Sequence, residues 1–134
     1  MLEGFVKLPI SSGNSLLSIT NNGLNFNGTV VLRMKKAKNI ILLLNKDKHQ
    51  IAIQKVDDIT EDSIIFFQSE KDLKSGIRLN NREIQQGIAI MMNWNLEECN
   101  YRADGFYIEE ESAMIFNLDS ARKFKKRAKK FTSK

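Results

Sequence analysis

Cysteine, histidine, proline and tryptophan are nearly absent from this chain. Its 134 residues hold one of each, namely Cys99, His49, Pro9 and Trp94. One cysteine cannot close a disulfide within the chain, and a zinc site with several Cys and His ligands cannot be assembled. One proline argues against a long unstructured linker. We therefore expect a folded, reduced protein without a disulfide or a zinc site.

Long hydrophobic runs are missing as well. The run at 40–44 holds five apolar residues, whereas a membrane-spanning helix needs about 18 or more. Residues 1–17 carry Glu3, Lys7 and Pro9 and lack the continuous apolar part of a secretory signal. We predict no membrane span and a cytoplasmic location.

Sequence patterns that carry catalysis are missing too. The chain has no Gly-rich phosphate loop, no GxSxG nucleophile turn and no calcium-loop pattern. His49 lies in a polar hairpin tip and is interpreted as a surface residue, while Glu97 and Glu98 beside Cys99 disfavour a thiolate. The glutamates at 109–111 are typical of a solvated turn, and a metal-dependent enzyme that uses them is a remote alternative. We predict no enzyme, no cofactor and no metal.

Charge is distributed unevenly, so the formal net charge of +5 averages three different segments. Residues 1–55 hold eight basic and two acidic residues, whereas residues 56–119 hold five basic and fourteen acidic ones. Residues 120–134 hold eight basic residues and no acidic one. This pattern indicates either an anionic partner such as nucleic acid or a tail that folds back on the acidic half of its own chain.

Hydrophobic periodicity predicts a small α+β fold in one domain over residues 1–119. Apolar, β-branched or alternating runs predict strands at 16–20, 40–44, 51–56, 64–67, 77–79, 101–108 and 113–118. Two helices are expected after asparagine-rich turns, over 30–38 and up to about residue 93. Their N-caps are expected at Asn27, Gly28 or Thr29, and at Asn80 or Asn81. In the second helix one apolar stripe is expected to face the core, formed by Ile84, Ile88, Met91 and Met92.

The same order of elements occurs twice. Residues 16–56 and residues 77–118 each read as a strand, an asparagine turn, a helix and a hairpin. The two segments match in element order and not in residue identity. This predicts two strand-helix-hairpin units in a pseudo-symmetric arrangement.

Residues 18–56, SITNNGLNFNGTVVLRMKKAKNIILLLNKDKHQIAIQKV, resemble the AbrB/MazE swapped-hairpin family of small bacterial DNA-binding domains. Asn22, Gly23, Leu24 and Phe26 stand at the turn and second strand of that pattern. The chain lacks the proline usual before the family's helix and the glycine usual after it. The resemblance implies a transcription-regulator-like protein whose paired units contact DNA through basic residues. A composition rich in Lys, Asn and Ile is typical of small proteins of low-GC bacteria and their phages, so a bacterial or phage origin is expected.

The last fifteen residues, 120–134, are predicted to form a basic amphipathic helix. Ala121, Phe124, Ala128 and Phe131 are spaced by three, four and three residues, which places them on one stripe. Crowded like charges would keep so short a helix marginal without a partner surface. We expect it to dock on nucleic acid, on an anionic membrane or on the acidic hairpin at 109–111 of its own chain.

We predict from these features a non-enzymatic protein that contacts nucleic-acid phosphates, with double-stranded DNA as the expected partner. The predicted contacts in the first half are the basic residues Arg33, Lys35, Lys36, Lys38, Lys46 and Lys48. The predicted contacts in the tail are Arg122, Lys123, Lys125, Lys126, Arg127, Lys129 and Lys130.

Two alternatives stay open. The basic residues of the first helix could simply be its solvated face. The protein could also be a protein-interaction module that binds a partner, such as an acidic protein or a second copy, through its acidic half or its tail.

Overall fold

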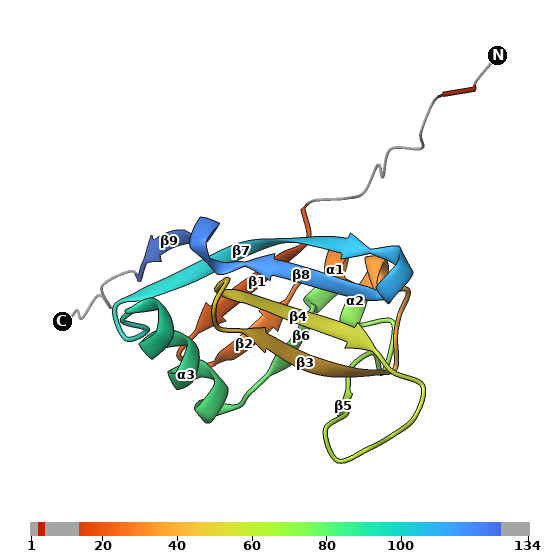
Figure 1. Ribbon diagram of the computed structural model, residues 1–134, viewed down its shortest axis with the longest axis horizontal. Coiled ribbons are helices and arrows are strands. Elements are labelled where there is room, and N and C mark those ends of the chain that lie inside the picture. The colour runs from red at the N-terminus through yellow and green to blue at the C-terminus, as the bar shows by residue number, and fades with distance from the viewer. Residues whose placement is uncertain (1–2, 5–13, 127–134) are drawn as a thin grey trace.

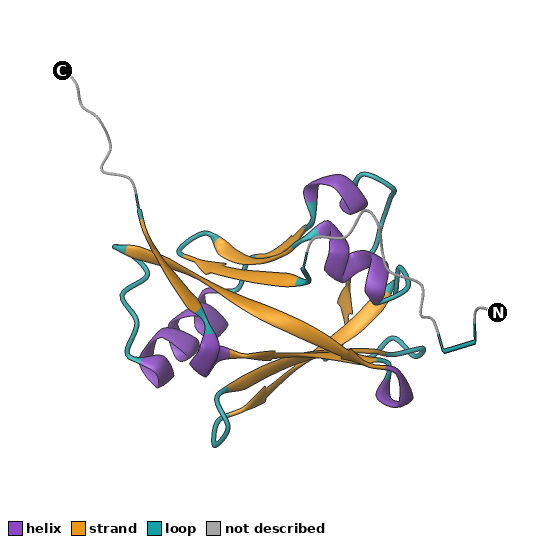
Figure 2. Cartoon of the chain, turned by 90° about the horizontal axis from the view of Figure 1, so that it is seen from above, coloured by secondary structure: helices purple, strands orange, loops and turns teal. Residues whose placement is uncertain are grey.

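A computed structural model describes residues 3–4 and 14–126 of the chain. In this part nine strands form one curled antiparallel sheet with the order β5-β3-β4-β8-β7-β1-β2-β6, and β9 pairs separately with β7 (Figures 1 and 2). The strands are β1 (Leu16–Thr20), β2 (Gly23–Phe26), β3 (Asn39–Asn45), β4 (Gln50–Lys55), β5 (Ile64–Ile65), β6 (Ile77–Leu79), β7 (Cys99–Ile108), β8 (Ala113–Asn117) and β9 (Arg122–Lys125).

Helices cover little of this sheet. They are α1 (Gly28–Arg33), α2 (Asp72–Ser75) and α3 (Arg82–Met92), together with the 3-10 turns η1 (Glu109–Glu111) and η2 (Leu118–Ser120). The helices α1 and α2 lie together at one end of the sheet, and α3 lies at the other (Figure 1).

Asparagine begins the two longer helices, as the sequence predicts. The side chains of Asn27 and Asn81 each accept a hydrogen bond of 3.1 Å, from the N–H of Val30 and of Ile84 respectively. The helix expected at 30–38 is shorter than predicted and starts earlier, because the φ angles of 59° at Lys35 and 55° at Lys36 end it. The capping asparagines therefore indicate where a helix begins, whereas the apolar pattern does not fix where it ends.

The predicted α+β fold with two strand-helix-hairpin units is wrong, because the fold is mainly β. The strands of 16–56 and 77–118 are interleaved in one sheet: β1 pairs with β7, β2 with β6, and β4 with β8. These contacts join residues far apart in the chain, which periodicity within one segment cannot indicate. The sheet, and not a pair of helical units, organises the molecule.

The core lies on the concave side of the curled sheet. Phe26 is in contact with Phe66 and Phe116, with ring centroids 5.7 Å apart in both pairs. All three rings are almost fully buried. β7 passes through both halves of the sheet, since its first half pairs with β1 and β9 and its second half with β8.

The tail is also different from the prediction, because its described part is a strand and not a helix. β9 follows the edge of β7 that β8 leaves free, with Arg122 opposite Arg102 and Lys125 opposite Cys99. Beyond it the N–H of Lys126 donates to the carbonyl of Glu98 at 3.0 Å. The edge of β7 that β8 leaves free offers a partner strand, whereas an isolated helix this short with crowded like charges is only marginally stable. Residues 127–134 lie outside the described part of the chain.

Candidate nucleic-acid interface

Five polar side chains form a row across the convex face of the sheet. Side chains alternate between faces along a strand, and directly paired residues share a face. The strand registers pair neighbours in a continuous series from β9 through β7, β1 and β2 to β6. We call this row the arginine face, and its members are Arg122, Arg102, Ser18, Asn25 and Arg78.

No other element packs on the arginine face within the described residues. The alternate side chains of the same strands, such as Leu17, Ile19 and Leu24, are buried in the core. The segment after α3 also packs on the core side, where the Trp94 and Tyr101 rings stack 3.8 Å apart. The three arginines are all exposed, while Ser18 and Asn25 between them are half-buried.

Neighbouring side chains hold the arginines in position. The Nη2 of Arg122 lies 3.2 Å from an Asp104 carboxylate oxygen, so phosphate would have to compete with this carboxylate for Arg122. The guanidinium of Arg102 lies 4.4 Å from the centre of the exposed Phe124 ring, a distance typical of a cation–π contact. These contacts bring a cation and an aromatic ring together at one end of the row.

Arg78, at the other end of the row, lies over Gly23. A Cβ at Gly23 would lie 3.0 Å from the Cγ of Arg78, and the φ of Gly23 is 146°. A side chain at position 23 would therefore push the arginine stem away. Because Gly23 has no side chain, the aliphatic part of Arg78 can lie against the backbone of β2.

The structure ties two of the predicted basic residues to acidic side chains. Lys35 is 3.8 Å from Glu109, and Lys36 is 3.2 Å from Glu70. Lys38 is exposed on the same turn, whereas Arg33 is half-buried at the end of α1. Exposed ion pairs add little stability, but these carboxylates would compete with phosphate for the two lysines.

The basic residues of the first half do not form one cluster. Lys35 and Lys38 precede β3, while Lys46 and Lys48 follow it at the hairpin tip (Figure 1). A strand rises about 3.3 Å per residue, so the seven residues of β3 separate the two groups by roughly 20 Å. The structure therefore does not bring these predicted contacts together on one surface.

Four of the predicted tail contacts lie in the described part of the chain. Arg122 belongs to the arginine face, Lys123 and Lys125 alternate with it on the exposed edge strand, and Lys126 follows the strand. This segment ends near Glu98, whereas the acidic turn at 109–111 lies at the other end of β7. The described tail therefore does not dock on that turn. Arg127, Lys129 and Lys130 lie outside the described residues.

Four residues of the arginine face were missed from sequence, namely Ser18, Asn25, Arg78 and Arg102. Both arginines lie in the segment of net negative charge, so a count of charge by segment hides them. The sequence signal that could have found Arg102 is the alternation of side chains along a strand. Cys99, Tyr101 and Ala103 are buried on one face, so Arg102 lies on the opposite face. Alternation can place a residue on a face of its own strand, but it cannot indicate which strands lie side by side.

No cluster of metal-ligating side chains accompanies this surface in the described residues. Nowhere in residues 3–4 and 14–126 do three His, Cys, Asp or Glu side chains gather closely enough to hold a metal ion. His49 is half-exposed at the hairpin tip, and its Nδ1 lies 2.8 Å from an Asp119 carboxylate oxygen. No described helix has the length and apolar character needed to cross a membrane.

Comparison with known proteins yields no relative. The chain matches no protein-family model, no curated protein and no solved structure. The resemblance of residues 18–56 to the AbrB/MazE family therefore stays a prediction.

Proposed function

We propose that the protein binds single-stranded nucleic acid on the arginine face. The observation that carries this proposal is the continuous row of three arginines, one serine and one asparagine across five neighbouring strands. Sheet surfaces that bind single strands combine cations along the backbone with an aromatic ring for base stacking. Phe124 beside Arg102 supplies that ring.

The dimensions of the row suit a flexible strand. Neighbouring strands lie about 4.8 Å apart, so the four steps from Arg122 to Arg78 cover roughly 19 Å. Arginine binds phosphate through two parallel hydrogen bonds, while Ser18 and Asn25 can bond to sugars or base edges. The basic segment that continues from β9 would add phosphate contacts at the Arg122 end. Double-stranded DNA, the partner expected from sequence, is a comparison in the experiment.

The experiment compares two double variants that each remove two positive charges. Arg78→Gln with Arg102→Gln changes the arginine face, whereas Lys38→Gln with Lys48→Gln changes exposed lysines that lie away from it. The probe is a fluorescein-labelled oligothymidylate of about ten nucleotides, a length that a small β domain can cover. Fluorescence anisotropy gives the Kd at several salt concentrations.

We expect the arginine double variant to weaken binding by tenfold or more and to lower the salt slope by about 0.7 for each phosphate that it no longer binds. The lysine double variant should bind within about twofold of the parent. Equal losses of affinity in the two double variants would contradict a specific surface, and so would an affinity for duplex DNA above that for the single strand. Equal binding of polyglutamate would favour an acidic protein as partner.

A further inference from the structure

One edge of the sheet is unpaired along most of β3. β5 pairs only with Asn39 and Ile40, whereas β4 pairs with the whole strand from Ile40 onward. The N–H of Val56 donates to the Asn39 carbonyl, and the direction of hydrogen bonding alternates along an antiparallel strand. The backbone N–H and C=O groups of Leu42 and Leu44 therefore point away from β4. In the described part of the chain no strand pairs with them.

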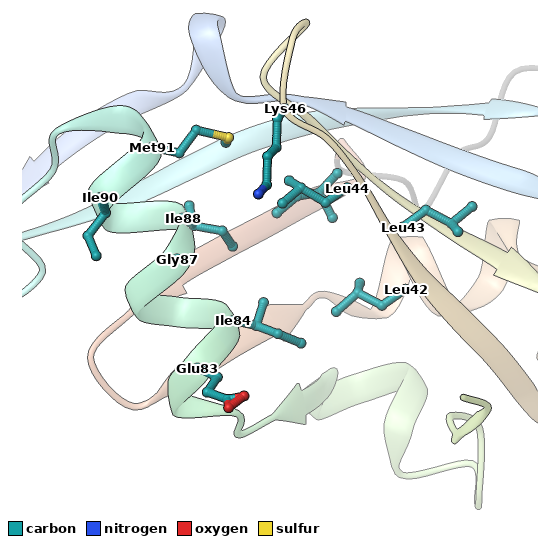
Figure 3. Close-up of a pocket in the computed structure, with 11 residues that line it drawn as sticks. Leu42, Leu43, Leu44, Lys46, Glu83, Ile84, Gly87, Ile88, Ile90 and Met91 are labelled. Atoms are coloured by element: carbon teal, nitrogen blue, oxygen red, sulfur yellow. The ribbon is translucent and has the colours of Figure 1, made fainter. Parts of the chain in front are cut away.

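An apolar groove of about 610 Å³ follows this edge (Figure 3). Leu42, Leu43 and Leu44 all line it, although consecutive side chains of a strand point to opposite faces. A groove over one face would be lined by alternate residues only. This groove therefore lies along the edge of β3, where the unpaired backbone groups are.

The helix α3 forms the opposite wall. Ile84, Gly87, Ile88 and Met91 line the groove from one side of this helix, and Ile90 is 81% exposed at its rim. A Cβ at Gly87 would meet no atom within 4 Å. The middle of the helical wall is thus open, which leaves room for a side chain that enters from outside.

Opposite charges mark the two ends of the groove. Lys46 lies at the hairpin end, and Figure 3 shows its amino group pointing between Leu44 and α3. Glu83 lies at the other end, on the first turn of α3. Both are exposed, and the remaining residues that line the groove are apolar or glycine. An occupant with an acidic group at one end and a basic group at the other would match these charges.

We propose that this groove binds an extended peptide of a partner protein, which adds to the sheet as a strand beside β3. The peptide would exchange backbone hydrogen bonds with Leu42 and Leu44 and place alternate apolar side chains against α3. Its acidic end would lie at Lys46 and its basic end at Glu83. A lipid could fill the apolar space but would leave the strand edge unpaired, and unpaired edges are a known site of strand addition.

The experiment uses the full chain and the synthetic peptide Lys-Val-Thr-Val-Thr-Val-Glu with blocked ends. In a strand, all valine N–H groups point to one edge and all threonine N–H groups to the other. Two further peptides are methylated on the valine nitrogens or on the threonine nitrogens. Fluorescence anisotropy measures the affinity of each labelled peptide, and circular dichroism checks the fold of each protein variant.

We expect the parent peptide to bind, one methylated peptide to bind tenfold or more weakly, and the other to bind like the parent. Gly87→Trp, which fills the groove, should abolish binding, while the control Gln86→Trp, at an exposed neighbour on the same helix that does not line the groove, should bind the peptide as the wild type does. Lys46→Glu should weaken binding several-fold, because it places like charges together.

Three outcomes would overturn the proposal. The first is no binding of the parent peptide. The second is an equal effect of both methylations on affinity, which would show that the peptide does not bind by strand pairing. The third is a dimer of the chain alone, measured by analytical ultracentrifugation, that Gly87→Trp dissociates; that result would assign the groove to a second copy. The arginine face lies on different strands, so failure here leaves the nucleic-acid proposal unaffected.

Discussion

Two glycines have opposite surroundings, and these surroundings decide whether a side chain can be added at each position. Gly105 lies in the part of β7 that pairs with β8, where an added Cβ would be 2.4 Å from Phe116 and 2.9 Å from the Met114 sulfur. Gly87 lies on α3, where an added Cβ would meet nothing within 4 Å. The packing around Gly105 leaves no room for a side chain. At Gly87 there is room for one, and its absence leaves the wall of the groove open.

Gly105→Ala should destabilise the protein and Gly87→Ala should stabilise it. Overpacking against two fully buried side chains costs roughly 1–3 kcal/mol, while replacing a helical glycine by alanine gains about 0.5–1 kcal/mol. Urea denaturation of both variants and the wild type measures these changes. A stable Gly105→Ala protein would show that the β7–β8 packing differs from the structure.

Gln85 joins α3 to the first hairpin and is 3% exposed. Its Nε2 donates to the carbonyls of Thr20 at 3.0 Å and Asn21 at 2.9 Å, and its Oε1 accepts from the Asn81 N–H at 3.1 Å. Apolar periodicity missed it, since the predicted stripe selected Ile84 and its neighbours. A polar residue can be buried when its partners are in place.

Gln85→Leu should lower the free energy of unfolding by about 1–3 kcal/mol, because two backbone carbonyls and one N–H lose their partner. Gln86→Leu is the matched control, since Gln86 is exposed on the same helix, and it should change stability by less than about 0.5 kcal/mol. Thermal and urea unfolding of the two variants check this difference. Equal effects would mean that the Gln85 contacts do not hold α3 in place.

At the scale of elements, the strand positions in the body were largely predictable, and so was the pairing within the two predicted hairpins, β3 with β4 and β7 with β8. The pairing of strands far apart in the chain was not. The strands at 16–20, 40–44 and 77–79 were correctly located by short apolar runs and adjoining turns. In the tail, the spacing of Ala121 and Phe124 favoured a helix, yet β9 forms because β7 offers an unpaired edge. Secondary structure that depends on a distant partner has little local signal.

Amide hydrogen exchange should alternate along β3. The N–H groups of Ile41 and Leu43 point to β4 and should exchange slowly, whereas those of Leu42 and Leu44 point outward and should exchange faster by a factor of ten or more. Exchange measured by nuclear magnetic resonance resolves each amide. Uniform protection along the strand would contradict an unpaired edge and would indicate that another segment or copy covers it.

At the scale of the whole molecule, the fold redistributes charges that the sequence separates into segments. Arg122 comes from the basic tail, while Arg78 and Arg102 come from the acidic segment, and the sheet places them in one row. The acidic residues Glu70 and Glu109 pair instead with lysines near α1. A surface whose three arginines come from three separate strands could not be found by summing charge along the chain.

A chain that ends at Lys126 should still fold and still prefer the arginine face. It keeps β9 and lacks Arg127, Lys129, Lys130 and Lys134. We expect weaker oligothymidylate binding and a salt slope lower by up to about 2.8, since each phosphate contact contributes about 0.7. Arg78→Gln with Arg102→Gln should still weaken binding by the shortened chain. Loss of all binding on truncation alone would assign binding to the tail and not to the sheet.

The central claim is that the convex side of the sheet binds nucleic acid. Nuclear magnetic resonance of the isotope-labelled chain, titrated with oligothymidylate, tests it most directly, because each backbone amide reports its own surroundings. The predicted result is that the largest shift changes occur at Ser18, Asn25, Arg78, Arg102 and Arg122. Largest changes at Lys35–Lys38 and at the 46–48 hairpin tip, with the arginine face unaffected, would contradict it.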